Sequence, residues 1–254
     1  MNGFKKHGID HLSASSINMF ANAPCAWVAK YLFGRKFNFA LAARAGVLVE
    51  DAVANIITDG MAIDDAIDFA VSAYNKQCAI GGSASDIKRG EGISGMIKIA
   101  VDELSKYGEP EYGGSVTKGR EQKKIEITCK GDGWSIPVIG YLDFDFPAHG
   151  LVVDLKTTMA APSNMSDEHI RQGAIYRFAK GNAAVKFLYV TPKKAVWHEI
   201  DEPKPVLEEI KIIATRMERL LRLDAEQIKD IVPVIASSYY WSGDEAARQE
   251  LYGF

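Results

Sequence analysis

The 254-residue sequence has few cysteines, no long hydrophobic run and no marked excess of either charge. Cys25, Cys78 and Cys129 are too far apart to form a paired zinc motif, and three thiols cannot build the disulfide framework of a small secreted domain. The most apolar long window, residues 39–57, is interrupted by charged side chains, which excludes a transmembrane helix. The chain does not open on the apolar segment of a signal peptide. We therefore expect a folded cytoplasmic protein that does not enter a membrane.

The small net charge of −3 excludes a strongly basic nucleic-acid-binding protein. The acidic excess is confined to residues 201–254, so the rest of the chain is nearly neutral. A nearly neutral surface of this kind is compatible with binding phosphate groups but does not by itself indicate it.

The spacing of apolar residues changes along the chain. Helical spacing predicts helices in the first part, at residues 12–33, 39–58, 63–80 and 93–107. The Gly- and Ser-rich segment 81–92 predicts a mobile loop, and it lacks the Gly-Lys-Ser/Thr of a phosphate-binding P-loop. A period of two then predicts strands at residues 124–130, 135–146, 151–157 and 185–190. Helical patterns return at residues 166–180 and 204–229.

This order of elements predicts an α/β protein in which helices surround a sheet. We expect a single domain over residues 1–254. It would comprise a mainly helical part at 1–110, a sheet core with an embedded helix at 111–200, and a C-terminal helical part at 201–254.

Two carboxylates and a lysine fall on neighbouring predicted strands. Asp143 ends the segment 140–143, and Asp154 and Lys156 follow in the next strand, where a period of two puts both on one face. Residues 147–150 contain Pro and Gly and predict a turn between antiparallel strands, which would allow Asp143 and Asp154 to converge on one cation. Asp145 shares a face with Asp143 and could support the site as a further carboxylate, but it is expected to be an exposed strand residue.

Three side chains on predicted helices could join them. Glu50 lies in the apolar stripe of its helix, and burial of a carboxylate requires a cation or a donor nearby. Alternatively, Glu50 reaches solvent at the edge of the stripe or pairs with Arg44. Gln172 and Tyr176 are one helical turn apart on the helix that follows the Asp-x-Lys strand, although this spacing also arises from ordinary packing. His169 has no metal-ligand companion at suitable spacing and is expected to be structural or exposed.

Four motifs occur in the order Gly46-x-x-x-Glu50, Gly140-x-x-Asp143, Asp154-x-Lys156 and Gln172-x-x-x-Tyr176. Together they resemble the motifs of the PD-(D/E)xK nuclease superfamily, and specifically of its RecB-type exonuclease branch. The segments 12–18 and 24–27 also look like the N-terminal segment of that branch, so the resemblance covers about residues 12 to 190. It implies a restriction-endonuclease-like fold with a central mixed sheet flanked by helices, an N-terminal helical region and a C-terminal helix.

The resemblance also implies a role for each motif residue. Three carboxylates would bind Mg²⁺ or Mn²⁺: Glu50, Asp143 and Asp154. Lys156 would orient or help activate the attacking water and offset charge on the phosphate. Gln172 and Tyr176 would position the scissile strand or the lysine. Some members of the branch hold an iron-sulfur cluster on one early and three late cysteines, which is excluded here because no cysteine follows Cys129.

The sequence therefore predicts a metal-dependent deoxyribonuclease, and in particular an exonuclease that acts on DNA ends in recombination, repair or phage-type DNA processing. A structure-specific or nicking endonuclease of the same fold is one alternative. A nucleic-acid-binding module without catalytic activity is another. DNA is the expected partner, and a homo-oligomer or a recombination or replication partner protein remains open.

Overall fold

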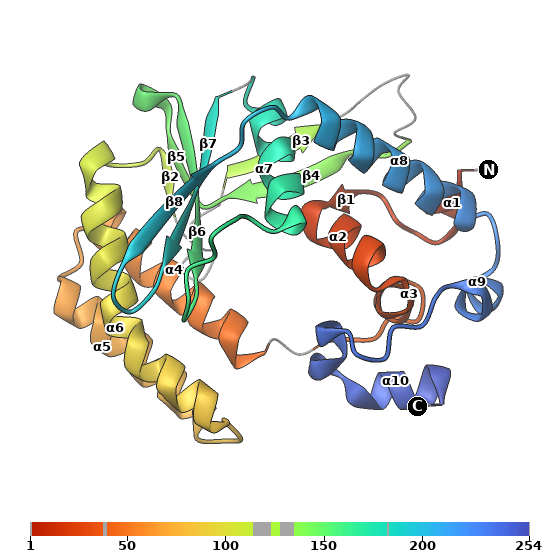
Figure 1. Ribbon diagram of the computed structural model, residues 1–254, viewed down its shortest axis with the longest axis horizontal. Coiled ribbons are helices and arrows are strands. Elements are labelled where there is room, and N and C mark those ends of the chain that lie inside the picture. Colours follow the sequence, from red (N-terminus) through yellow and green to blue (C-terminus); the bar gives the residue numbers. More distant parts are fainter. Residues whose placement is uncertain (1, 38–39, 114–122, 128–134, 182, 254) are drawn as a thin grey trace.

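The strands form two sheets in the computed structural model, which describes all residues except 1, 38–39, 114–122, 128–134, 182 and 254 (Figure 1). The larger sheet has the order β2-β5-β6-β7-β8, in which only β6 and β7 are parallel neighbours. Its strands are β2 (Tyr112–Gly113), β5 (Phe144–Phe146), β6 (Leu151–Thr157), β7 (Ala184–Val190) and β8 (Ala195–Glu199). The smaller sheet has the order β1-β4-β3, formed by β1 (Leu12–Ser13), β4 (Val138–Leu142) and β3 (Lys123–Ile127).

Helices cover both faces of the larger sheet (Figure 1). One face packs against α4 (Leu41–Asp59) and α6 (Ala84–Leu104), on which α5 (Ile63–Cys78) packs in turn, and their shared core includes Phe144, Phe146 and Val153. The core on the other side contains Val152 and Phe187. It is built with α2 (Ala14–Asn22), α3 (Pro24–Tyr31), α7 (Asp167–Ala179), α8 (Lys204–Leu220), α9 (Ala225–Ile231) and α10 (Glu245–Tyr252).

The remaining elements are short. Among the described residues they are the helix α1 (Gly3–Lys6) and the 3₁₀ turns η1 (Ser105–Tyr107), η3 (Pro147–His149) and η4 (Tyr239–Gly243). No helix within the described residues is long and apolar enough to cross a membrane. The alternation of helices and strands confirms the expected α/β class.

The expected single strand at 135–146 is wrong. The chain bends at Asp143, so β4 belongs to the smaller sheet and β5 to the larger one. The expected turn at 147–150 is present as η3, and Gly150 after it has a φ of 58°, in the left-handed region that glycine favours. β5 and β6 pair antiparallel as expected, with Phe144 opposite Val153. The predicted strands at 151–157 and 185–190 are confirmed, whereas the end of the one at 124–130, with Cys129, lies outside the described residues.

Helix α7 connects the parallel strands β6 and β7, and its ends are those predicted. The Ser166 hydroxyl accepts a hydrogen bond from the His169 N–H at 3.4 Å, and acidic Asp167 and Glu168 stand at the positive end of the helix dipole. The buried Arg171 holds α7 against α2 and α8, because its guanidinium donates to Asn18 on α2 at 3.1 Å and to Glu209 on α8 at 2.6 Å.

The expected mobile loop at 81–92 is wrong, because helix α6 begins at Ala84. Ser83 and Asp86 form a capping box: the Ser83 hydroxyl accepts from the Asp86 N–H, and the Asp86 carboxylate accepts from the Ser83 N–H at 3.0 Å. The glycines allow close packing. A Cβ at Gly92 would lie 2.6 Å from Pro192, and one at Gly95 would lie 2.5 Å from the Pro192 carbonyl oxygen.

Candidate active site

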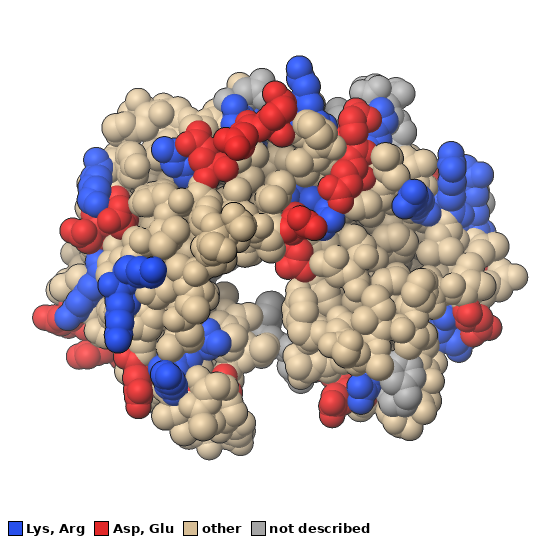
Figure 2. Space-filling model, viewed as in Figure 1, with Lys and Arg blue, Asp and Glu red and all other residues tan. Residues whose placement is uncertain are grey.

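A cavity of about 890 Å³ separates the sheet and α4 from the N-terminal and C-terminal segments. Figure 2 shows a hollow in the same region, between α4, α7 and α2 as Figure 1 places them. The cavity contains Asp143, Lys156, Gln172 and Tyr176, four of the six predicted site residues. The structure thus brings residues from β6, from the bend between β4 and β5, and from α7 to a single concave surface.

Asp143 sits at the bend between the two sheets. Its Oδ2 accepts a hydrogen bond from the backbone N–H of Leu155 at 3.0 Å. The last pair of the β5–β6 ladder is Phe144 opposite Val153, and Asp143 lies just outside it, so its carboxylate takes the place of a strand partner. Continuing the register places Asp143 beside Asp154. The two predicted carboxylates therefore converge, but through a bend and not through the continuous strand that was expected.

Asp154 and Lys156 project from the same face of β6. Asp154 is fully buried, and its Oδ1 lies 2.5 Å from the Lys156 ammonium. Burial acts to lower the pKa of Lys156, but the carboxylates of Asp154 and Asp143 outweigh it and raise this pKa, so the lysine is charged. The Lys156 side chain is 25% exposed, which leaves it reachable from the cavity.

Helix α7 supplies neutral hydrogen-bonding groups to this pair. The Gln172 amide donates to Asp154 Oδ2 at 2.8 Å and to the Tyr176 hydroxyl at 2.8 Å. The Tyr176 hydroxyl in turn donates to the Tyr141 carbonyl oxygen at 2.7 Å, which ties α7 to β4. Gly140 makes room for this ring, because a Cβ there would lie 2.7 Å from Tyr176 Cε1. Two of the sequence motifs thus meet in one packing contact.

Glu50 on α4 approaches from the opposite side of the sheet. Gly46, one turn earlier, lets α4 come close to the end of β6, since a Cβ at this position would lie 3.3 Å from Thr157 Oγ1. The pKa of Asp143 is raised well above its usual range, first by loss of hydration and then by the negative charges of Glu50 and Asp154. Glu50 is therefore close enough to Asp143 to repel its charge, and the site holds more negative than positive charge.

The three carboxylates do not form a closed metal site. Among the described residues, no three His, Cys, Asp or Glu side chains are arranged as a ready ligand set. The chemistry of the site nevertheless fits a hard cation. Asp154 Oδ1 is buried and faces the Lys156 ammonium, and carboxylate oxygens such as those of Asp143 and Asp154 are the ligands that Mg²⁺ and Mn²⁺ prefer. A divalent cation would also reduce the repulsion that raises the Asp143 pKa.

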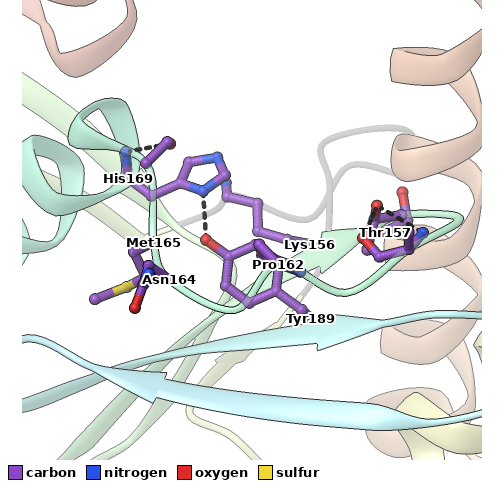
Figure 3. A pocket seen from close by; sticks show the side chains of 10 residues that line it. Lys156, Thr157, Pro162, Asn164, Met165, His169 and Tyr189 are labelled. Atoms are coloured by element: carbon purple, nitrogen blue, oxygen red, sulfur yellow. Dashed lines mark hydrogen bonds between the residues drawn. The ribbon is translucent and has the colours of Figure 1, made fainter.

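His169, which was expected to be structural or exposed, lies at the edge of the site. It lines the cavity, and its Nδ1 lies 2.5 Å from the hydroxyl of Tyr189 on β7 (Figure 3). Burial and the nearby Lys156 charge lower the His169 pKa to about 4, so the imidazole is neutral near pH 7. The sequence carried a signal for this position, since His169 precedes Gln172 by three residues and shares its helix face. The sequence carried no corresponding signal for Tyr189.

The C-terminal segment contributes aromatic side chains that the sequence did not indicate. Tyr239 and Tyr240 line the cavity and stack on each other, with ring centroids 4.1 Å apart. Tyr239 is 63% exposed, and its hydroxyl is 3.5 Å from Glu168 at the start of α7. These tyrosines come together with β6 only through the tertiary fold.

Asp145 is not the exposed residue that was expected. It is 1% exposed, and its carboxylate pairs with the Lys180 ammonium at 2.8 Å. This pair joins β5 to the C-terminal end of α7 and so stabilises the frame of the site.

Comparisons with known proteins do not assign this chain to a family. No family model matches the chain, and no curated protein matches it. Among solved structures, the crystal structure of SSO0001 matches 73% of this chain and 77% of its own, with 16% sequence identity and a TM-score of 0.37. A likeness this weak carries no argument about function.

Proposed function

We propose that this protein is a metal-dependent deoxyribonuclease with a restriction-endonuclease-like core, and that it acts as an exonuclease on DNA ends. The observation that carries the proposal is that Asp143 and Lys156 meet at one cavity, with the buried Asp154 directly behind them, paired with Lys156 and bonded to Gln172. Metal-dependent hydrolysis of a phosphodiester uses a bound cation, an oriented water and a positive charge near the phosphate. These residues are of the types that supply all three.

Asp143 and Asp154, with Glu50 beside them, would hold Mg²⁺ or Mn²⁺ in this proposal. The cation would lower the pKa of a bound water and stabilise the charge that develops on the phosphate. The ammonium of Lys156 is charged and partly exposed, so it can orient the water and offset phosphate charge. Gln172 keeps Asp154 in a fixed orientation, and Tyr176 fixes Gln172 in turn.

The proposal is tested with three DNA substrates, namely linear duplex, closed circular duplex and single strand, each with Mg²⁺, Mn²⁺ or EDTA. We expect cleavage of linear DNA with either metal, no cleavage in EDTA, and loss of cleavage in Lys156→Ala. Lys186→Ala is the matched control, because Lys186 lies on the neighbouring strand β7 and pairs with Glu199, outside the cavity.

The same experiment separates the alternatives. Cleavage of the closed circle would favour an endonuclease of the same fold. DNA binding without metal-dependent cleavage of any of the three substrates would refute both enzyme functions and leave a nucleic-acid-binding module. Cleavage that persists in Lys156→Ala at the wild-type rate would contradict the assignment of the site.

A further inference from the structure

A second cavity, of about 440 Å³, opens beside Lys156 (Figure 3). It lies where the C-terminal ends of β6 and β7 meet the start of α7, and in parallel β-α-β units this is the edge at which ligands bind. Its volume falls within the range of ~300–1,000 Å³ that is typical of small-molecule pockets. Lys156 and His169 line both this cavity and the larger one, so the two cavities adjoin.

The outer wall of the second cavity is a fixed segment, residues 158–166. At its beginning, the Thr158 N–H donates to the Val190 carbonyl oxygen at 3.0 Å, which extends the contact between β6 and β7. In its middle, the Pro162 carbonyl oxygen lies 3.2 Å from His198 Nε2 on β8. The segment ends at Ser166, the cap of α7. The cavity is therefore preformed, and a ligand would not have to order its wall.

The lining of this cavity fits a neutral, flat group better than an anion. Among the described residues that line it, Lys156 carries the only permanent positive charge, and its ammonium is already 2.5 Å from Asp154. His169 is neutral near pH 7, since its pKa is lowered to about 4 by burial and by Lys156. Met165 and Pro162 provide apolar contact. Hydroxyl, amide and ring-nitrogen groups at the edges can donate or accept hydrogen bonds.

His169 is oriented to take part in such contacts. Its ring stacks on Phe187 on one side, with centroids 5.5 Å apart, and its Nδ1 is bonded to the buried Tyr189 hydroxyl. These two contacts fix the plane of the imidazole. Its Nε2 forms no hydrogen bond with any residue that the structure describes, so this nitrogen is available to a ligand.

We propose that the second cavity binds one unpaired base of the DNA strand whose phosphate lies at Lys156. This inference rests on the proposed nuclease function and specifies its substrate. Because Lys156 borders both cavities, a phosphate at the larger cavity and a base in the smaller one can belong to the same nucleotide or to neighbours. A base that is paired and stacked in a duplex must leave the stack to enter, which is least costly in a single strand or a frayed end. The cavity therefore selects unpaired strands.

The test uses single-stranded oligonucleotides in which one base at a time is replaced by an abasic site, cleaved with Mn²⁺. At one fixed position relative to the cut, we expect the abasic site to lower kcat/KM about tenfold in the wild type, equivalent to ~1.4 kcal/mol. Abasic sites elsewhere should change it less than about twofold. Met165→Ala should abolish the position-specific loss, because it removes an apolar wall of the cavity.

Met159→Ala is the matched control, since Met159 is also a partly buried methionine near the end of β6 but lines a different cavity. It should retain the tenfold loss. If thermal unfolding shows that Met165→Ala does not fold, Asn164→Ala, at an exposed cavity position, decides the question.

The outcomes separate the two proposals. Equal cleavage of intact and abasic strands at every position, or a position-specific loss that persists in Met165→Ala and Asn164→Ala, would overturn the base site while leaving the nuclease function intact. Cleavage of blunt duplex ends as fast as single strands would also contradict it. No metal-dependent cleavage of any DNA by the wild type would refute the nuclease function, and the base site with it.

Discussion

Gly140→Ala should destabilise the protein through Tyr176 and reduce activity without touching a catalytic group. The new Cβ would lie 2.7 Å from Tyr176 Cε1 and 3.3 Å from Ile125 Cγ1. Neither neighbour can move freely, because both are buried and the Tyr176 hydroxyl is bonded to Tyr141 and Gln172. A displaced Tyr176 ring would shift Gln172 and loosen its hydrogen bond to Asp154.

The magnitude is a balance of opposing effects. Overpacking a buried contact costs ~1–3 kcal/mol, and weakening the hydrogen bonds of Tyr176 costs a further ~0.5–1.5 kcal/mol. Replacing glycine by alanine inside a strand recovers ~0.5–1 kcal/mol, since alanine loses less backbone entropy on folding. We expect the free energy of unfolding to fall by roughly 0.5–4 kcal/mol, and metal-dependent cleavage to fall by about tenfold, which is ~1.4 kcal/mol in the barrier.

Urea unfolding in EDTA and cleavage of linear DNA measure the two effects. Gly81→Ala is the matched control: a Cβ there meets nothing within 4 Å, so stability and cleavage should stay close to wild type. Combining Gly140→Ala with Tyr176→Leu should cost at least ~1 kcal/mol less than the sum of the single changes, because the clash needs the ring. Additive costs, or wild-type stability of Gly140→Ala, would refute the reasoning.

Three further predictions follow from charge and capping. Lys156→Met should lower the free energy of unfolding by ~3 kcal/mol at pH 7, because it leaves Asp154 buried without its counter-ion. An Asp154→Asn change added to it should recover most of that loss, and no recovery would contradict the ion pair. In EDTA, Asp143→Asn should be more stable than wild type by a margin that grows as the pH rises from 4 to 8. The raised pKa of Asp143, caused by lost hydration, Glu50 and Asp154, means that the folded protein binds this proton more tightly than the unfolded chain and loses stability as the proton is released. A margin that does not change with pH in urea unfolding would exclude this effect. Ser83→Ala should cost ~1 kcal/mol by removing the cap of α6, with cleavage unchanged, and unchanged unfolding would show that the capping box contributes nothing.

Local periodicity predicted the parts of the site that lie on one element. The pairing of Asp154 with Lys156 follows from a period of two on β6, and the bond between Gln172 and Tyr176 follows from a spacing of four on α7. The N-terminal start of α7 could also be predicted, because Ser166 is a residue type strongly preferred at the N-cap. Each of these features depends on residues within about one turn or one strand of each other.

Features that depend on contacts between distant segments were missed. Tyr189 joins His169 across 20 positions, and the Tyr239–Tyr240 pair reaches the cavity from the far end of the sequence. The glycines of α6 were misinterpreted for the same reason. A segment rich in glycine is typical of a loop. Only the position of Pro192, on a separate segment, shows that these glycines permit close packing.

The bend at Asp143 shows how a correct prediction can rest on a wrong local structure. A continuous strand would give Leu155 a backbone partner, and the Asp143 side chain would then point away from the strand plane like any other. Because β5 begins only at Phe144, the Leu155 N–H is left for the Asp143 carboxylate, which is thereby drawn into the plane of the sheet beside Asp154. The bend also sends β4 into the smaller sheet, where Gly140 and the Tyr141 carbonyl receive Tyr176. One interruption of the strand therefore positions the carboxylate and anchors the helix that orients its neighbour, so the irregularity is a requirement of the site.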